Sequence, residues 1–385
     1  MTQLCKVKMH IGIFLQYINA IFMKVLIFIV CIVFVLAVII YVLRHTWNII
    51  PGKKWIKWLV VGVGIASIIS MFAGFAAGLE CMPAAVAKIT YAVGTSWMFV
   101  MLYAAIVFAI ADILTLCKIL PKEFLENSIA GTAAIFFIVA GIMVYGNIHY
   151  YEKEKINLDI KTEKKIRKDL KIVMLSDLHL GFHNGRKELA RWIDMINAEN
   201  PDLILFGGDI VDISTKPLLE ERMYEEFHRL KANAYACMGN HENFSGIEKA
   251  TEFYKLANIV LLNDRNIQTN GINISGRKDF SDRKRESLEN ISAEMDKSMF
   301  SILLDHEPYY LEKAEECGYD FQFSGHTHYG QVWPVSWITD AIYECAYGSH
   351  KRGGTEYYVS SGMGIWGGKF RIGTQSEYVV VNIHN

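Results

Sequence analysis

The sequence lacks the patterns that mark several common classes of protein. Its seven cysteines form an odd set without a C-x-x-C pair, which argues against a disulfide framework. It has no G-x-S-x-G turn, no G-x-x-x-x-G-K-[ST] loop and no catalytic cysteine signature, so none of these three types of site is indicated. No internal repeat or low-complexity segment is present. A formal net charge of -1 provides no overall electrostatic attraction to nucleic acid.

Charged residues are scarce in the first part of the chain. The hydrophobic fraction is 52% and the charged fraction 21% over 385 residues, which is a high apolar content for a soluble protein. Buried helices of a soluble bundle would carry polar stripes, and the apolar segments before residue 150 show almost none. We therefore predict four transmembrane helices, each free of Asp, Glu, Lys and Arg, at about residues 25–43, 58–79, 89–111 and 129–148.

The predicted spans contain no ionisable residue near their middle, whereas an ion pathway or proton relay usually needs one. We therefore predict that residues 1–150 are a membrane anchor and not a transporter. The membrane side stays open, because basic residues in the first and third loops favour an outside location for the C-terminal part of the chain, and those at 153–168 favour the reverse. The segment 10–23 is either an interfacial helix or, if translation begins at Met23, upstream sequence.

The pattern of apolar and polar residues changes after the last predicted span. Short apolar or β-branched runs alternate with amphipathic stretches, which predicts a layered α/β domain over residues 151–385, preceded by the all-α transmembrane region. The predicted strands are 155–160, 172–175, 203–206, 234–238, 272–275, 300–304, 321–323, 356–359 and 378–383. The predicted helices are 187–198, 218–230, 247–256, 284–297 and 309–317.

Side chains that can bind metal follow the ends of five predicted strands, where open α/β sheets usually bind their ligands. Each of them alone is also explained as a helix cap, a turn residue or a satisfied polar neighbour of the core. Several carboxylates and imidazoles crowded at one sheet edge would be costly without cations to compensate them. We therefore predict a metal site from the joint pattern: Asp177, His179, Asp209, Asp212, Asn240, His241, His306, His326 and His328.

These residues fall into five blocks in a fixed order: D-x-H at 177–179, G-D-x-x-D at 208–212, G-N-H-E at 239–242, a lone His306 and G-H-x-H at 325–328. The order resembles the calcineurin-like metallophosphoesterase family over roughly residues 171–385. The membrane-embedded N-terminus is similar to the membrane-associated bacterial branch, which includes enzymes resembling UDP-2,3-diacylglucosamine diphosphatase. The fold that the resemblance implies is a layered β-sandwich flanked by helices.

The resemblance also implies a centre of two divalent metal ions that share a nucleophilic water. His241 would act on the phosphoryl group or its leaving oxygen, and Asp212 would orient the imidazole ring. The mixed oxygen and nitrogen ligands suit Mn, Fe, Zn or Ni without naming the pair. One ion would be held by Asp177, His179, Asp209 and His328, and the other by Asp209, Asn240, His306 and His326, with Asp209 bridging.

The function expected from these observations is a membrane-anchored phosphohydrolase that cleaves a phosphoester or pyrophosphate. Its partners would be membrane lipid and a phosphorylated small molecule or lipid substrate, without nucleic acid. A nuclease is the alternative enzyme, disfavoured because there is no obvious long basic groove. A non-catalytic metal-binding membrane sensor is the other alternative, although metal storage alone needs neither His241 nor Asp212.

Two further clusters allow two interpretations each. The basic run at 277–285 is either a solvated face or an approach for an anionic substrate. The aromatic residues near the C-terminus either pack in the core or line an apolar entrance at the lipid interface that admits an amphiphile. They are Trp333, Trp337, Tyr343, Tyr347, Tyr357, Tyr358 and Trp366.

Overall fold

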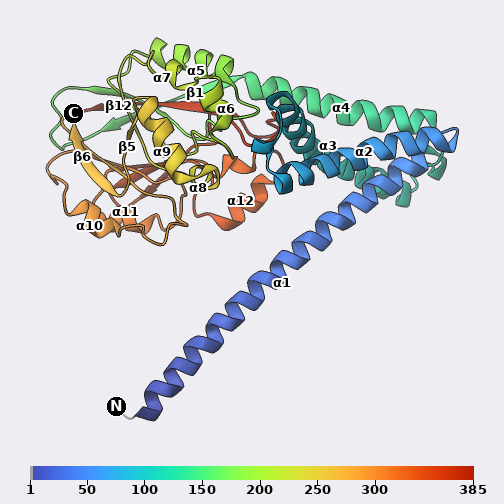
Figure 1. Cartoon of the computed structure of the whole chain (residues 1–385), viewed down its shortest axis with the longest axis horizontal. Helices are drawn as coiled ribbons and strands as arrows, with labels where there is room; N and C mark the ends of the chain where they lie inside the picture. Colours follow the sequence, from blue (N-terminus) through green and yellow to red (C-terminus); the bar gives the residue numbers. More distant parts are fainter. Residues whose placement is uncertain (1–2) are drawn as a thin grey trace. The chain divides into compact units, whose positions relative to one another are not determined.

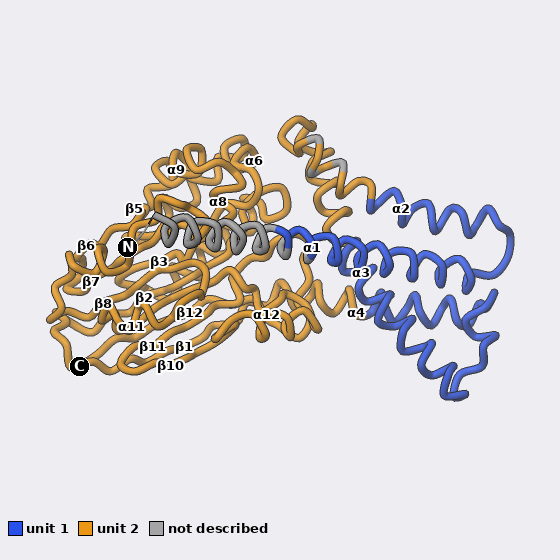
Figure 2. The backbone as a smooth tube through the Cα atoms, turned by 90° about the horizontal axis from the view of Figure 1, so that it is seen from below, with its two compact units in different colours: residues 1–68, 97–141 blue, residues 69–96, 142–385 orange. Residues whose placement is uncertain are grey.

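The computed structural model describes residues 3–385, except for the side chains of residues 3–21, 23, 24, 27, 73, 75 and 77. The chain forms two compact units, one of residues 1–68 with 97–141 and the other of residues 69–96 with 142–385 (Figure 2). The segment 10–23 is part of helix α1, and most of its side chains, like residues 1 and 2, lie outside the described residues.

Four long apolar helices precede the α/β part of the chain: α1 (Gln3–Ile49), α2 (Lys54–Ala77), α3 (Ala84–Leu116) and α4 (Ile129–Tyr151). Each contains a stretch long and apolar enough to cross a membrane: Phe28–Ile49, Lys54–Phe72, Ala84–Leu116 and Ile129–Tyr151. Large apolar side chains such as Phe34, Trp58 and Phe137 are exposed on these helices, as lipid-facing surfaces require. The four predicted apolar helices are thus present, with longer bounds than the sequence predicted.

The second unit contains two six-stranded mixed sheets (Figure 1). The first has the order β1-β12-β2-β3-β4-β5, with β1 (Lys153–Lys161), β2 (Leu170–Leu175), β3 (Leu203–Phe206), β4 (Asn233–Ala236), β5 (Val260–Leu261) and β12 (Ser376–His384). The second has the order β10-β11-β9-β8-β7-β6, with β6 (Arg265–Thr269), β7 (Ile272–Gly276), β8 (Ser301–Leu304), β9 (Phe321–Ser324), β10 (Gly348–Arg352) and β11 (Thr355–Val359).

The two sheets pack face to face with helices on the outside, so the predicted sandwich fold is confirmed. In β2, Ile172 and Met174 point into the interior between the sheets, where they meet residues such as Ile302 and Phe323. Val173 and Leu175 point the other way, into a core shared with the helices. Because both faces of β2 are buried, the strand reads as a nearly continuous apolar run.

The helices cover the outer faces of the two sheets. Those packed on the first sheet include α5 (Arg186–Ala198), α7 (Tyr224–Phe227) and α9 (Ile247–Leu256). Those on the second include α10 (Leu288–Ser292) and α11 (Glu312–Cys317). The remaining helical segments are η1 (Leu79–Cys81), η2 (Lys122–Phe124), α6 (Lys216–Glu220), α8 (Asn240–Ser245), η3 (His328–Gly330) and α12 (Ser336–Ile342).

Three predicted helices are shorter than expected, and the one predicted at 309–317 begins only at Glu312. The helix predicted at 218–230 is divided into α6 and α7, because Arg222 between them has a φ of 51°, outside the helical region. Of the helix predicted at 284–297, only Leu288–Ser292 is helical. The Ser287 hydroxyl oxygen caps this helix by accepting a hydrogen bond from the backbone N–H of Asn290. The sequence pattern also missed β5, β6 and β10.

Candidate metal centre

The candidate ligands leave the strand ends through sharply turned backbone. Asp177 and His179 follow β2, and Asp209 follows β3, with φ values of 56°, 44° and 52°. His326 and His328 follow β9 with φ values of 69° and 48°. This left-handed conformation costs a residue with a Cβ atom about 1–2 kcal/mol. Five strained positions around one point are typical of a functional site, where the surrounding fold holds a geometry that folding alone would not select.

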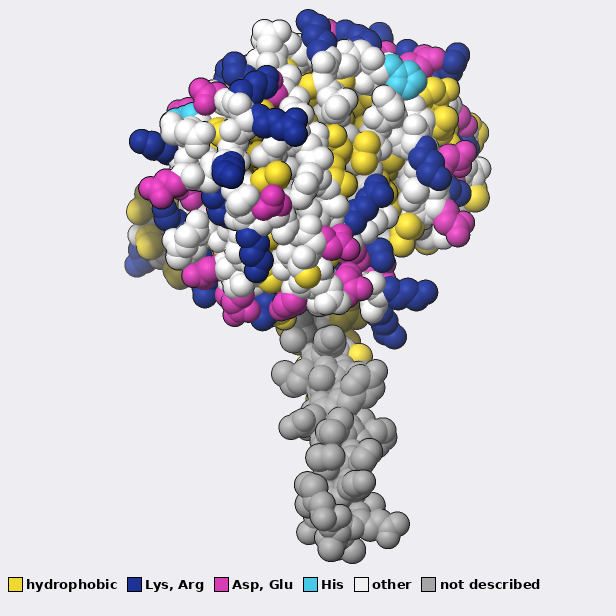
Figure 3. Space-filling model, turned by 90° about the vertical axis from the view of Figure 1, so that its left-hand side faces the viewer, with side chains coloured by type: hydrophobic (Ala, Val, Ile, Leu, Met, Phe, Trp, Pro, Cys, Tyr) yellow, Lys and Arg dark blue, Asp and Glu magenta, His cyan; other side chains and the backbone are white. Residues whose placement is uncertain are grey.

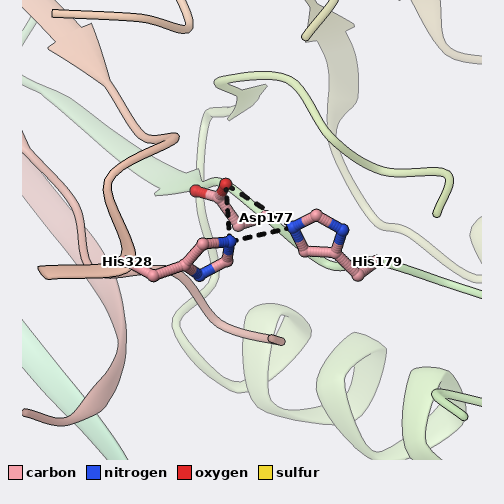
Figure 4. A group of neighbouring side chains, drawn as sticks. All are labelled: Asp177, His179 and His328. Atoms are coloured by element: carbon pink, nitrogen blue, oxygen red, sulfur yellow. Dashed lines mark hydrogen bonds and ion pairs between the residues drawn. The ribbon is translucent and has the colours of Figure 1, made fainter. Parts of the chain in front are cut away.

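The first group of side chains consists of Asp177, His179 and His328 (Figure 4). The Nε2 atoms of the two histidines are 3.0 Å apart. The Asp177 Oδ1 atom is 3.7 Å from His179 Nε2 and 3.5 Å from His328 Nε2. Three ligand atoms therefore converge on one point, as one coordination sphere requires.

Asp209 connects this group to a second one. Its Oδ2 atom is 3.7 Å from His179 Nε2 and 3.1 Å from His306 Nε2. The His306 Nδ1 atom is 2.7 Å from the Gly207 carbonyl oxygen, which can only accept, so Nδ1 carries a proton. His306 Nε2 is buried and faces Asp209 Oδ2. Beside a buried carboxylate, that nitrogen requires either a proton or a cation, so these residues fit a metal.

Asn240 and His326 complete the second group. The Asn240 Oδ1 atom is 2.9 Å from His326 Nδ1, and the ring of His326 lies edge-on to that of His306, with centroids 5.3 Å apart. The backbone N–H of His326 donates to Asp177 Oδ1 over 3.1 Å. The structure thus brings all seven predicted ligands together at one edge of the sandwich. Their assignment as ligands stays a prediction.

His241 and Asp212 lie next to the first group. The Asp212 Oδ1 atom is 3.0 Å from His241 Nδ1 and 3.4 Å from His179 Nδ1. These three residues are also close enough to hold a metal ion. However, His179 already directs Nε2 at Asp177 and His328, and a carboxylate at the opposite ring nitrogen is the usual way to orient a ligand histidine. The geometry therefore suits Asp212 as the residue that orients both imidazole rings.

The histidines differ in their affinity for protons. Burial lowers the pKa of His179, but its bonds to Asp177 and Asp212 outweigh burial and raise the pKa to about 10. The pKa of His306 is likewise raised, because the charge of Asp209 outweighs burial. Burial and the charge of His306 lower the pKa of His326 to about 4, and burial lowers that of His328 to about 3. Each group thus pairs one imidazole whose pKa is raised with one whose pKa is lowered.

Two residues that support the centre were not identified from the sequence as supporting residues. Glu242 is fully buried, and its carboxylate accepts bonds from the backbone N–H groups of Asp209 (3.1 Å) and Gly239 (2.8 Å). Arg371 is also fully buried and donates to the His328 carbonyl oxygen over 2.8 Å. The G-N-H-E block contains Glu242 and was a usable signal, whereas nothing near Arg371 in the sequence marks it as buried.

Position 239, beside Asp209, has room only for glycine. A Cβ atom on Gly239 would lie 2.2 Å from Asp209 Oδ1. That close approach lets the carboxylate also accept a bond from the His241 backbone N–H, over 2.9 Å. The glycine of the G-N-H-E block thus keeps room for the carboxylate that links the two groups.

The basic run at 277–285 is partly used inside the protein. Arg277 and Arg285 both pair with Asp305, the residue before His306, with the Arg277 pair at 3.3 Å. Lys278 pairs with Asp264 at 3.3 Å. The two arginines hold the loop that carries His306, and all three cations are engaged by neighbouring carboxylates.

Comparison with known proteins places the same residues in a known family. The family model described as calcineurin-like phosphoesterase matches residues 170–330. An uncharacterized metallophosphoesterase of Campylobacter jejuni is 31% identical over 255 residues, which are 64% of this chain and 68% of that protein. One of Bacillus subtilis is 28% identical, over 64% of this chain and 92% of that protein. A transmembrane protein with metallophosphoesterase domain of Danio rerio is 26% identical, over 66% of this chain and 62% of that protein.

Proposed function

The chain belongs to the calcineurin-like phosphoesterase family, and from this premise we propose that it is a membrane-anchored, dinuclear-metal hydrolase of phosphoesters or pyrophosphates. The observation that carries the proposal is the position of Asp209. Its Oδ2 atom faces His179 on one side and His306 on the other, at 3.7 and 3.1 Å. One carboxylate oxygen between two sets of nitrogen ligands is the arrangement that a bridged pair of cations needs.

The proposed ligands of the first ion are Asp177, His179, Asp209 and His328, and those of the second are Asp209, Asn240, His306 and His326. When bound, the ions supply an activated water and neutralise charge on the phosphoryl oxygens. Asp177 and Asp209 provide the negative charge that holds them, and both carboxyls have lowered pKa values because neighbouring histidines outweigh burial. Mn, Fe, Zn and Ni all suit these ligands.

His241 is the proposed proton donor to the leaving oxygen. Its Nδ1 atom faces Asp212 at 3.0 Å, which leaves Nε2 for the substrate. Burial would raise the pKa of Asp212, but its bonds to His179 and His241 outweigh burial and keep the pKa below the usual range. Asp212 therefore stays ionised. It holds a proton on His241 Nδ1, the ring nitrogen that faces away from the substrate.

The proposed substrate carries an apolar part. Four exposed side chains, Trp333, Trp337, Ile338 and Ile342, lie on or just before α12, with Trp337 64% exposed. Tyr343, which follows α12, lies edge-on to His326 with ring centroids 6.3 Å apart. An aromatic and apolar surface therefore runs from α12 to the second ligand group, which supports an amphiphilic phosphate or diphosphate of the kind cleaved by the diacylglucosamine diphosphatase branch. Tyr357 and Tyr358 of the same predicted cluster are buried in the core.

The charges on one face of the second unit do not favour nucleic acid as a partner. On the face of the second unit drawn in Figure 3, Lys and Arg side chains are interspersed with Asp and Glu. A nucleic-acid groove needs clustered positive charge along the path of the backbone. The net charge of -1 agrees with this.

The test of the proposed mechanism is His241→Ala in the metal-loaded full chain. Loss of a positioned proton donor should reduce the turnover of an aryl phosphate ester about a hundredfold or more, with the metal content unchanged. His228→Ala is the matched control, because His228 is exposed, with its Nε2 atom 2.7 Å from the Leu256 carbonyl oxygen and its ring 6.2 Å from that of Tyr224. Loss of metal in His241→Ala would instead make His241 a ligand.

The substrate class is tested by comparing a lipid pyrophosphate with a soluble phosphodiester on the detergent-solubilised protein. A higher kcat/KM for the lipid, reduced by Trp337→Ser, is expected, because α12 would lose apolar contact area. A clear preference for the soluble compound would contradict the proposed amphiphile and leave the hydrolase assignment in place.

A further inference from the structure

The end of the second apolar helix and the start of the third belong to the same compact unit as the sandwich, because that unit includes residues 69–96. Leu79, Ala87 and Tyr91 form an apolar cluster with Phe182, which lies three residues after His179. Two polar contacts reinforce it: Ser214 Oγ donates to Glu80 Oε1 over 2.6 Å, and Lys88 pairs with Glu221. The hairpin of residues 69–96 is therefore packed against the loops that follow β2 and β3.

Tyr91 extends this contact to the centre itself. Its hydroxyl donates a hydrogen bond to Asp212 Oδ2 over 2.6 Å and accepts one from the Gly367 backbone N–H over 3.2 Å. The side chain is buried, at 2% exposure, about two helical turns from the start of α3. The ring is held between Phe182 and His183, with centroid distances of 6.4 and 6.1 Å. The position of the hydroxyl is thus fixed on several sides.

The two oxygens of Asp212 face different partners. Oδ1 lies 3.0 Å from His241 Nδ1, whereas Oδ2 accepts the bond from Tyr91. A carboxylate held by one oxygen alone can rotate about its Cβ–Cγ bond, and a donor on the second oxygen fixes the plane of the group. The direction in which Oδ1 points at His241 is therefore set in part by a tyrosine on a candidate membrane-spanning helix.

We propose that Tyr91 is a positioning residue for His241, acting through Asp212, so that a candidate membrane-spanning helix forms part of the catalytic apparatus. The inference rests on the proposed role of His241 in hydrolysis. Without the hydroxyl, Asp212 Oδ2 would be buried next to an apolar ring, and the carboxylate would reorient toward another donor. The His241 ring would then lose its fixed orientation, whereas His179, which Asp212 also faces, would still be directed by the contacts of its Nε2 atom with Asp177 and His328.

Tyr91→Phe is the test variant, because it removes the hydroxyl and keeps the ring packed on Phe182. We expect kcat to fall about tenfold to a hundredfold, the range for residues that orient a catalytic or ligand histidine, with little change in KM or metal content. Glu80→Gln is the matched control: it alters another polar contact of the same hairpin, with Ser214, that involves neither oxygen of Asp212, and it should retain kcat.

A double-mutant cycle separates positioning from general stabilisation. If Tyr91 acts through His241, Tyr91→Phe should reduce kcat in the wild-type chain but have almost no further effect in His241→Ala. An equal loss in both backgrounds, or no loss in either, overturns the proposal. If His241→Ala itself retains full turnover, the proposed role of His241 is wrong. This result is visible in the single variant, so it is distinguished from a failure of the Tyr91 proposal.

A spectroscopic measurement tests the positioning role of Tyr91 without relying on turnover. In the zinc-loaded protein, the downfield proton resonance of His241 Nδ1–H, identified by its loss in His241→Ala, reports the bond to Asp212. This resonance should shift in Tyr91→Phe and stay in place in Glu80→Gln. An unchanged resonance in Tyr91→Phe would show that Asp212 holds His241 without the tyrosine, and the positioning role would be wrong.

Discussion

The candidate centre has two regions, a floor of Asp177, His179, Asp209 and His306 and a rim of Asn240, His326 and His328. Floor side chains are at most 1% exposed, whereas each rim residue is half-buried. The floor histidines have raised pKa values and the rim histidines lowered ones. The floor therefore holds charge that only protons or cations can balance, and the rim offers the neutral imidazole nitrogens of His326 and His328 and the amide oxygen of Asn240. We infer that the floor determines whether metal is bound and that the rim tunes how tightly.

Asp209→Asn should have the largest effect, because it replaces the carboxylate whose Oδ2 atom faces His179 on one side and His306 on the other. We expect loss of most bound metal and a fall in kcat/KM of about a thousandfold, equivalent to several kcal/mol of transition-state stabilisation. Metal analysis and steady-state kinetics measure the two effects. Asp159→Asn, at an exposed residue of β1, is the control. Retention of both metals in Asp209→Asn would remove the distinction between floor and rim.

His306→Ala and His326→Ala remove the same type of side chain from the floor and from the rim, so they compare the two regions directly. His306 is buried and bonded to the Gly207 carbonyl oxygen over 2.7 Å, so its removal should lower the free energy of unfolding by about 2–4 kcal/mol. His326 is half-buried, and its removal should cost about 1 kcal/mol or less while still weakening metal binding. Denaturant unfolding with metal titration measures both. Equal losses of stability would contradict the comparison.

Metal binding should strengthen as pH rises, because metal must displace a proton from the floor residue His179. The pKa of His179 is raised to about 10 in the metal-free fold, so this pairing stabilises the fold fully below the unfolded pKa and is lost as pH rises through about 10. Metal requires the neutral ring and displaces the proton. The increase in Tm on adding zinc should therefore be a few degrees larger at about pH 8 than at about pH 6. A larger increase at the lower pH would contradict the floor assignment.

The floor and rim residues could be predicted from the sequence because each follows an apolar run that forms a strand. Apolar runs such as Leu203–Phe206 are local signals, and the strands they predict carry Asp209 and its counterparts to one sheet edge. The family motif then supplied the pairing of ligands. The local pattern could not locate the edge strands β5, β6 and β10, which have few buried residues.

Supporting residues could not be predicted because their partners are distant in the sequence. Tyr91 lies in an apolar segment read as membrane span, and its bond to Asp212 joins residues 121 positions apart. Arg371 is fully buried among carbonyl oxygens, although an arginine in a polar segment usually indicates surface. Periodicity records which face of an element is apolar, and it carries no information about which remote group a side chain meets.

The place of β12 within its sheet has a consequence for biogenesis. This strand lies between β1 and β2, pairing Ser376 with Lys153 on one side and Val379 with Met174 on the other. The strand that directly continues α4 therefore lacks its neighbour until residues 376–384 have left the ribosome. Asp177 emerges early, yet the sheet that aims it closes only after translation has passed those residues. The first sheet, and with it the edge that carries Asp177, is thus complete only once residues 376–384 have been synthesised.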